Sequence, residues 1–433
     1  MFPLIYLMAG LLVLIFLTLK KVNPFLALLL ASVITGLLGG LNAVDCLNAI
    51  EKGVGQTLGS TLLILTLGGA YGSILEKSGA VQQLTHGLLQ YWGISKIQWA
   101  IMAISFLIGL PLFYNAAFIL LFPLVSGLII STGLPVRYLA LPMVASLSIT
   151  HALTPPHPAP TALAGMLNAS IPQTLLWGLC IAFPTAVIGG PLLSRFYKWE
   201  SKAQNVLEPA TKPDGPGSGL SLFMALLPII LITGGNAVDA IGHESLRYAF
   251  ELISMPVMAL LVSLLFAAWN LGLKRGSTMQ EVMQWMVKGM DSIFPILLIV
   301  AAGGAFKEIL MAVGVADKLA GMAAMWQIHP LLFAWILAAS IRVAIGSATV
   351  AALTAAGLVA PSMVNGAVSP ELMVLAIGSG SIFFSHLNDA GFWMFKEFFQ
   401  LSVKETFLSW TLMESCISLI GLAGVWIIYM FVG

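Results

Sequence analysis

Two short polar segments in an otherwise apolar chain contain the side chains best suited to take up and release protons. Residues 151–160 read HALTPPHPAP and residues 385–391 read SHLNDAG. A histidine exchanges a proton near neutral pH. A carboxylate inside a membrane costs about 2.5 to 3.5 kcal/mol on insertion scales and is rarely placed there without a role. These properties predict that Asp389, His386 and His151 are proton-coupling residues.

Each of these residues also has a purely structural interpretation. Asp389 precedes the expected start of a half-helix, where it would cap free backbone N–H groups, and this is compatible with proton exchange. The two histidines would otherwise be buried residues whose hydrogen bonds are satisfied internally. Glu414, inside the last apolar run, is a weaker candidate for carrying a proton.

The two polar segments are related by an internal repeat. Gly69 recurs as Gly304 and His151 as His386, each 235 positions later, and several glycine, alanine and proline pairs keep the same offset. Beyond the histidines the offset becomes 232. The two halves of the chain are therefore expected to have equivalent polar centres.

Both polar segments should interrupt a helix. Four prolines between positions 155 and 160 remove backbone donors and clash with the preceding turn. In the second half, Asn388, Asp389 and Gly391 occupy the equivalent region. Broken backbone at membrane depth is tolerated only where protein or a water-filled cavity satisfies the freed groups, as at the midplane sites of transporters.

Polar or small residues also interrupt two apolar runs, 97–131 and 331–361, which predicts a re-entrant hairpin in each half. Helix ends that meet at such tips and breaks favour an anion, because their N–H groups are free. Nearby hydroxyls and amides suit an acid rich in hydroxyl groups. Arg342 would pair with the carboxylate of the ligand or with one of the protein. The predicted binding residues are Tyr114, Asn115, His151, Thr154, His157, Ser347, Thr349, Ser385, His386, Asn388 and Arg342.

Other kinds of site are not expected. His157 follows His151 by six residues, a spacing with no standard metal-ligand meaning, so no metal is predicted. The net charge of +1 provides no basic surface for nucleic acid. The glycines at 378 and 380 fall in an apolar run and favour close helix packing over a nucleotide loop.

The composition predicts an all-α polytopic membrane protein, because 59% of the residues are hydrophobic and only 9% are charged, against about 25% charged in soluble domains. Each half is expected to have five crossings and one hairpin. The first repeat is placed at 1–197, a cytoplasmic linker at 198–219 and the second repeat at 220–433. Discontinuous helices are expected at 139–166 and 372–398, and the other spans at 3–19, 24–41, 57–75, 174–195, 220–238, 252–272, 293–313 and 407–431.

An odd number of crossings turns the second half upside down relative to the first, which defines inverted-topology repeats. If the N-terminus is extracytoplasmic, fourteen Lys and Arg residues fall in cytoplasmic segments and four in outer segments, with the intramembrane Arg342 left out. The four outer residues are Lys52, Arg247, Lys307 and Lys318. Positive charge is concentrated on the cytoplasmic side of membrane proteins. Both termini are therefore predicted to be extracytoplasmic.

Three segments resemble the gluconate permease (GntP) family of bacterial proton symporters: 150–160 (THALTPPHPAP), 342–354 (RVAIGSATVAALT), and 385–397 (SHLNDAGFWMFKE) with 401–406 (LSVKET). The similarity extends over nearly the whole chain. It implies a multi-pass protein of the bacterial cytoplasmic (inner) membrane and, by analogy with the wider ion-transporter superfamily, a homodimer. Dicarboxylate carriers of that superfamily have Ser-Asn-Thr at a hairpin tip. The tips here, Tyr114-Asn115-Ala116 and Ser347-Ala348-Thr349, differ and make a sodium site less expected than proton coupling.

The resemblance implies a secondary active transporter that imports gluconate or a related sugar acid with at least one proton. It needs no cofactor, and its expected partners are the organic acid and the lipid bilayer. Within the family, D-serine or another small hydroxy or amino acid is the alternative substrate. An intramembrane enzyme using His386 and Asp389, or a passive channel, are remote alternatives, since no metalloprotease motif or nucleophile beside a base is present.

Overall fold

The computed structural model describes residues 2–83, 96–197, 215–234, 244–314, 328–360, 368–387 and 389–432. These residues form helices and no strand, which confirms the all-α prediction. The helices of the first half are α1 (Phe2–Leu19), α2 (Pro24–Leu38), α3 (Ala43–Lys77), α5 (Ile97–Gly109), α6 (Tyr114–Thr132), α7 (Val136–Leu153), α8 (Pro158–Leu167) and α9 (Ile171–Val187), which continues as η2 (Ile188–Leu192) and η3 (Arg195–Tyr197).

The helices of the second half follow in the same order. They are α10 (Ser218–Gly234), α11 (Glu244–Ser254), α12 (Pro256–Ala267) with η5 (Ala268–Gly272) and η6 (Leu273–Arg275), α13 (Met279–Ala312), α15 (Pro330–Ile345), α16 (Ala348–Val359), α17 (Pro370–Gly380), α18 (Ala390–Phe398), α19 (Val403–Thr406), η8 (Phe407–Thr411) and α20 (Leu412–Val432). Most of the predicted linker, positions 198–214, lies outside the described residues, and α10 begins at Ser218, just inside its predicted end.

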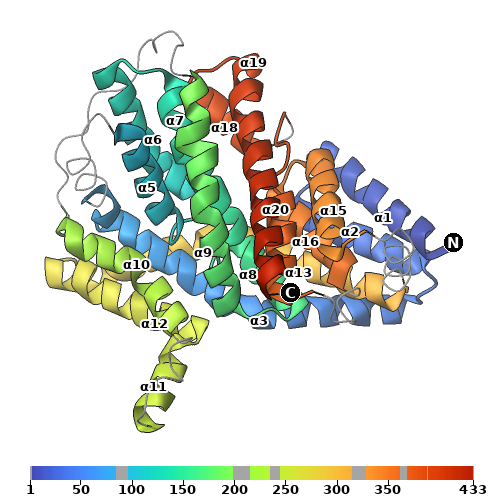
Figure 1. The fold of residues 1–433 in the computed structure, drawn as a ribbon. Helices are drawn as coiled ribbons and strands as arrows, with labels where there is room; N and C mark the ends of the chain where they lie inside the picture. The colour runs from blue at the N-terminus through green and yellow to red at the C-terminus, as the bar shows by residue number, and fades with distance from the viewer. Residues whose placement is uncertain are drawn as a thin grey trace.

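The long helices α3 and α13 are repeat equivalents, because α3 shifted by 235 positions covers 278–312 and α13 spans Met279–Ala312. They run side by side in opposite directions along one side of the molecule (Figure 1). Glycines allow their backbones to touch: a Cβ on Gly53 would lie 2.3 Å from the Gly304 carbonyl oxygen, and one on Gly289 would lie 2.3 Å from that of Gly69. The antiparallel pairing of equivalent helices is the arrangement that inverted repeats require.

Both long helices begin well before the apolar spans predicted at 57–75 and 293–313. Asn42 caps α3 by accepting a hydrogen bond from the Asp45 backbone N–H. Thr278 and Glu281 form a reciprocal capping box at the start of α13. Hydrophobicity located only the membrane-depth part of each helix, whereas the caps set where the helix starts.

The flanking helices α2 and α12 each pack on the long helix of the other half. The helix α2 packs on α13, and its counterpart α12 packs on α3. Figure 1 shows α1 and α2 at one end of the α3–α13 pair and α10 and α12 at the other. Likewise α5 packs on α7 and α15 packs on α17. The first helix of each predicted hairpin thus packs on the broken helix of its own half.

Five helical stretches in the described part of the chain are long and apolar enough to cross a membrane: Val136–Leu167, Ile171–Tyr197, Pro256–Arg275, Met279–Ala312 and Val403–Val432. A sixth is α3, which bends by 46° near its middle. Other predicted spans coincide with shorter apolar helices such as α2 and α17. At 15 residues, α2 is about 22 Å long and does not cover roughly 30 Å of hydrocarbon by itself.

Candidate functional site

The first helix break separates α7 from α8 at residues 154–157. Thr154 is fully buried and donates its hydroxyl to the Thr150 carbonyl at 2.7 Å, which ends the helix with an internal bond. Pro155 and Pro156 have no N–H to donate. Pro158 then occupies the first turn of α8, where a missing donor costs nothing. The break therefore brings His157 inward without leaving its own backbone N–H unsatisfied, since that group donates to Thr154 O.

The second break, between α17 and α18, is longer than expected. We predicted an interruption at Ser385–Gly391, but α17 already ends at Gly380. The Ser381 hydroxyl donates to the Gly378 carbonyl at 2.8 Å and competes with the continuing helix. Close packing also occurs here, because a Cβ on Gly378 would lie 2.5 Å from Ala152 O and one on Gly380 would lie 2.6 Å from Trp335 O. These contacts confirm the packing role predicted for the two glycines.

The buried Arg342 and the half-buried Asp389 form an ion pair between the last turn of α15 and the second break. The Arg342 side chain is nearly inaccessible, and Nη2 donates to Asp389 Oδ2. Its other two nitrogens, Nε and Nη1, are buried without a hydrogen-bond partner in the described part of the chain. Of the two interpretations of Arg342, pairing with a protein carboxylate is present, and donors for a second acceptor remain.

Asp389 is held by neutral donors as well as by Arg342. Its Oδ1 accepts the Gly391 backbone N–H at 2.8 Å, so it caps α18 as expected. Ser385 donates its hydroxyl to Oδ2 and accepts the Trp410 indole N–H at 2.8 Å. Thr411 donates to the Ser385 backbone carbonyl at 2.6 Å. The break at 381–389 is thereby fixed to η8, and the Asp389 carboxylate has a defined position.

Glu414, a weaker candidate in the sequence, is buried and interacts with Arg342 and Asp389. Its side chain is 2% exposed, and Oε1 accepts the Ser148 hydroxyl of α7 at 2.5 Å. Oε2 has no partner among the described residues. Glu414 interacts electrostatically with both Arg342 and Asp389. We call Arg342, Asp389 and Glu414 the buried charged cluster.

Tyr114 connects the first hairpin tip to the buried charged cluster. It begins α6, and its ring lies 6.3 Å from that of His151 and 6.2 Å from that of Trp410 between centroids. It interacts electrostatically with Glu414 and Asp389, and its buried hydroxyl interacts with the Ser148 side chain that also bonds Glu414. The predicted contribution of this tip to a binding site is consistent with this position.

His151 and His157 form a hydrogen-bonded chain. His157 Nε2 lies 2.6 Å from the Gly109 carbonyl, and its Nδ1 lies 3.3 Å from Nδ1 of His151. A carbonyl only accepts, so Nε2 of His157 donates. In the neutral pair, Nδ1 of His157 then accepts from Nδ1 of His151. The chain ties the broken helix to the end of α5, and His151 Nε2 stays available as an acceptor.

Several predicted binding residues do not belong to the buried charged cluster. Asn115 is exposed at the start of α6, and Thr349 is half-buried in the first turn of α16. Ser347 caps α16 by accepting from the Val350 N–H at 3.4 Å. The half-buried His386 ring lies 3.1 Å from the Phe384 carbonyl through Nδ1. Asn388 lies outside the described residues, so its role and that of His386 stay predictions.

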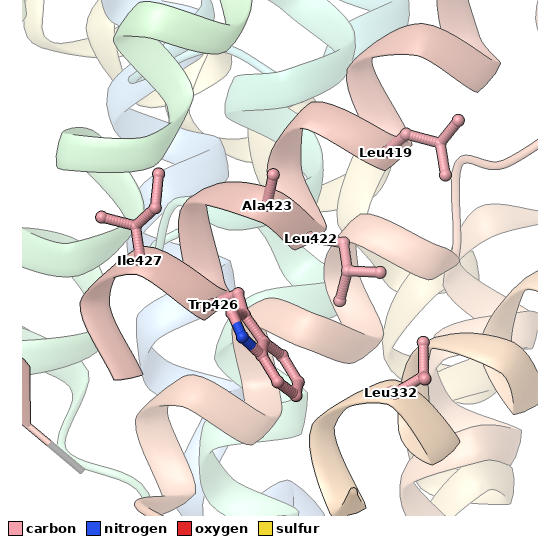
Figure 2. A pocket seen from close by; sticks show the side chains of 6 residues that line it. All are labelled: Leu332, Leu419, Leu422, Ala423, Trp426 and Ile427. Carbon is pink, nitrogen blue, oxygen red and sulfur yellow. The ribbon is translucent and has the colours of Figure 1, made fainter. Parts of the chain in front are cut away.

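An open apolar groove lies along α20, away from the buried charged cluster. Figure 2 shows its lining side chains on α20 and α15, and its volume is about 490 Å³. It has no charged group and therefore no means of recognising an acid. The lining residues are Leu332, Leu419, Leu422, Ala423, Trp426 and Ile427. No group of three or more His, Cys, Asp or Glu side chains suitable for a metal ion occurs in the described ranges.

The sequence is similar over nearly its whole length to several proteins named as transporters or permeases. It is 40% identical to the "High-affinity gluconate transporter" of Escherichia coli strain K12 over 98% of both chains. It is 39% identical to the "Gnt-II system L-idonate transporter" of the same strain, again over 98% of both. Identity to the "Gluconate permease" of Bacillus subtilis strain 168 is 40%, over 97% of this chain and 98% of the relative.

The fold also has a solved counterpart. The YdaH transporter of Alcanivorax borkumensis, whose crystal structure "reveals an unusual topology", superposes with a TM-score of 0.65 at 14% identity, covering 98% of this chain and 99% of the other. At this identity the likeness concerns the fold alone. The model of the family described as "GntP family permease" matches residues 2–431. The chain is therefore a transporter rather than an enzyme, and it belongs to the GntP family of permeases.

Proposed function

We propose that the protein imports gluconate or a closely related sugar acid, together with protons, across the bacterial cytoplasmic membrane. The observation that carries the proposal is the buried Arg342, which has one carboxylate partner and two nitrogens, Nε and Nη1, without a partner in the described residues. An unpaired donor on a buried cation is costly unless a ligand uses it. A monovalent carboxylate is the ligand whose charge and geometry match a guanidinium.

The neighbouring polar groups support a hydroxylated acid. The Tyr114 ring packs against the His151 ring, and Nε2 of His151 is available to accept a hydroxyl of the ligand. A polyol chain offers hydroxyls that both donate and accept. Relatives named for gluconate and for L-idonate, both sugar acids, favour the same class of substrate.

Uptake into proteoliposomes tests the proposal. Labelled gluconate is supplied under an inward proton gradient, with and without an uncoupler, and with unlabelled L-idonate, D-serine and a dicarboxylate as competitors. We expect accumulation above equilibrium that the uncoupler abolishes and that L-idonate reduces more than D-serine. Accumulation of D-serine alone would reassign the substrate, and uptake that never exceeds equilibrium would contradict coupled transport.

A further inference from the structure

The buried charged cluster contains two carboxylates and one cation. Asp389 receives the Arg342 guanidinium, the Ser385 hydroxyl and a backbone N–H, so its charge is compensated. Glu414 receives only the neutral Ser148 hydroxyl, and its second oxygen has no partner in the described residues. A buried carboxylate without its own cation is strongly disfavoured. Of the two acids, Glu414 is the one whose charge depends on a bound proton.

The buried polar atoms of the cluster without a hydrogen-bond partner in the described residues belong to residues that interact electrostatically with one another. Arg342 has free Nε and Nη1, and Glu414 has a free Oε2. Glu414 interacts electrostatically with Arg342 and with Tyr114. Free donors and a free acceptor within one buried group of residues form an incomplete site. A ligand carboxylate would complete the Arg342 side, while a proton would complete the Glu414 side.

Resting on the proposed function, we propose that Glu414 carries the transported proton, and that its ionised carboxylate and the substrate carboxylate are alternative partners for Arg342. When Glu414 is ionised, the approaching anion meets two negative charges and one positive charge. When a proton from the outer solution binds to Glu414, one negative charge is removed and the free N–H groups of Arg342 are available. After the substrate leaves, Arg342 again favours the ionised form, and the proton is released.

Other titratable groups around Glu414 are already engaged or uncharged. The groups that interact with it from neighbouring elements are Arg342 on α15, Asp389 before α18 and the Tyr114 phenol on α6. On α7, His151 contacts Tyr114 and shares its Nδ1 with His157. Both ring nitrogens of His157 have partners. The cluster therefore offers Glu414 as its one acid with a free oxygen and no cation of its own.

The decisive variant is Glu414→Gln, which imitates the protonated acid and keeps an acceptor for Ser148. In proteoliposomes we expect this variant to exchange labelled for unlabelled gluconate but to lose uncoupler-sensitive accumulation. Glu308→Gln is the matched control. Glu308, on α13, is also buried, but it forms an ion pair with Lys52 of α3 and does not belong to the buried charged cluster. The control should accumulate gluconate like the wild type. Coupled accumulation by Glu414→Gln would overturn the inference.

A binding measurement on purified protein provides a second test that needs no transport. Gluconate affinity of the wild type should fall up to tenfold per pH unit on the alkaline side, where Glu414 must take up a proton to bind the anion. Addition of gluconate in weak buffer should then withdraw about one proton per substrate bound. A wild type that binds gluconate with no proton uptake contradicts the Glu414 assignment. A wild type that neither binds nor transports any sugar acid overturns the proposed function, and the inference with it.

Discussion

At the scale of single residues, the Arg342–Asp389 pair combines a structural and a binding role. Asp389 neutralises the charge of Arg342, whose side chain is almost inaccessible to solvent. It also caps α18 and so positions the second break. Removing one member of a buried pair leaves an uncompensated charge, while replacing both with apolar side chains of similar size is often tolerated. The two roles can therefore be separated by mutation.

We expect Asp389→Leu alone to lower the stability of the protein by about 3 to 5 kcal/mol, because Arg342 would then be buried without a counter-ion. The double variant Arg342→Met with Asp389→Leu should recover much of this loss but remain unable to take up gluconate. Thermal unfolding in detergent measures the first effect, and proteoliposome uptake measures the second. Transport by the double variant would contradict a role of Arg342 in binding the substrate.

The residues of this pair were predicted, but their pairing was not. A buried arginine and a carboxylate in a helix break are both conspicuous in an apolar chain, yet 47 positions separate them and nothing in the sequence fixes which carboxylate Arg342 meets. Glu414 was underestimated for a similar reason. It stands in an apolar run, and its partner Ser148 is 266 positions away. Only the packing of α20 on α7 reveals that the two side chains meet.

At the scale of elements, the molecule depends on the close approach of α3 and α13. The backbones meet at two glycine contacts, Gly53 with Gly304 and Gly69 with Gly289. Small residues at such contacts allow the dispersion contacts and tight packing that hold membrane helices together. The repeated Gly69 and Gly304 were visible in the sequence as an exact duplicate. Their partners Gly53 and Gly289 do not obey the same offset, so the contact itself required the fold.

Adding one methyl group to this contact should separate the two helices. We expect Gly53→Ala to destabilise the protein by about 1 to 3 kcal/mol, since a Cβ would lie 2.3 Å from backbone and the cost of overpacking is of this size. Gly55→Ala is the control on the same helix. No atom lies within 4 Å of its Cβ position, and alanine favours helix over glycine. Unfolding midpoints should fall for the first variant and stay level or rise for the second. Equal midpoints would contradict the contact.

Helix interruptions were predicted with unequal success, for a physical reason. The break after α7 follows from prolines, which remove N–H groups wherever they stand. The break after α17 begins at Ser381, whose hydroxyl donates to the Gly378 carbonyl and competes with the backbone hydrogen bonds that would continue the helix. A serine can continue a helix or end it, and its neighbours decide. Sequence therefore located the second polar region but placed the end of α17 too late.

At the scale of the whole molecule, the antiparallel α3–α13 pair agrees with the charge distribution along the chain. The predicted outer residue Lys52 on α3 forms an ion pair with Glu308 at 2.9 Å, beside the predicted outer residue Lys307 on α13. Lys307 in turn donates to the Met166 carbonyl at the end of α8. The positions that the Lys and Arg count assigned to one side of the membrane are therefore neighbours in the fold.

This arrangement makes the orientation of the protein testable in whole cells. In a cysteine-free background, Glu51→Cys at the Lys52 end of α3 should react with a membrane-impermeant thiol reagent. A cysteine in place of Lys274, which precedes α13, should react only after the cells are permeabilised. Both native side chains are exposed in the structure, so accessibility to the reagent depends on the side of the membrane. The reverse pattern would place both termini in the cytoplasm. Labelling of both sites from outside would contradict opposite orientations of the two halves, because equivalent ends of α3 and α13 would then face the same solution.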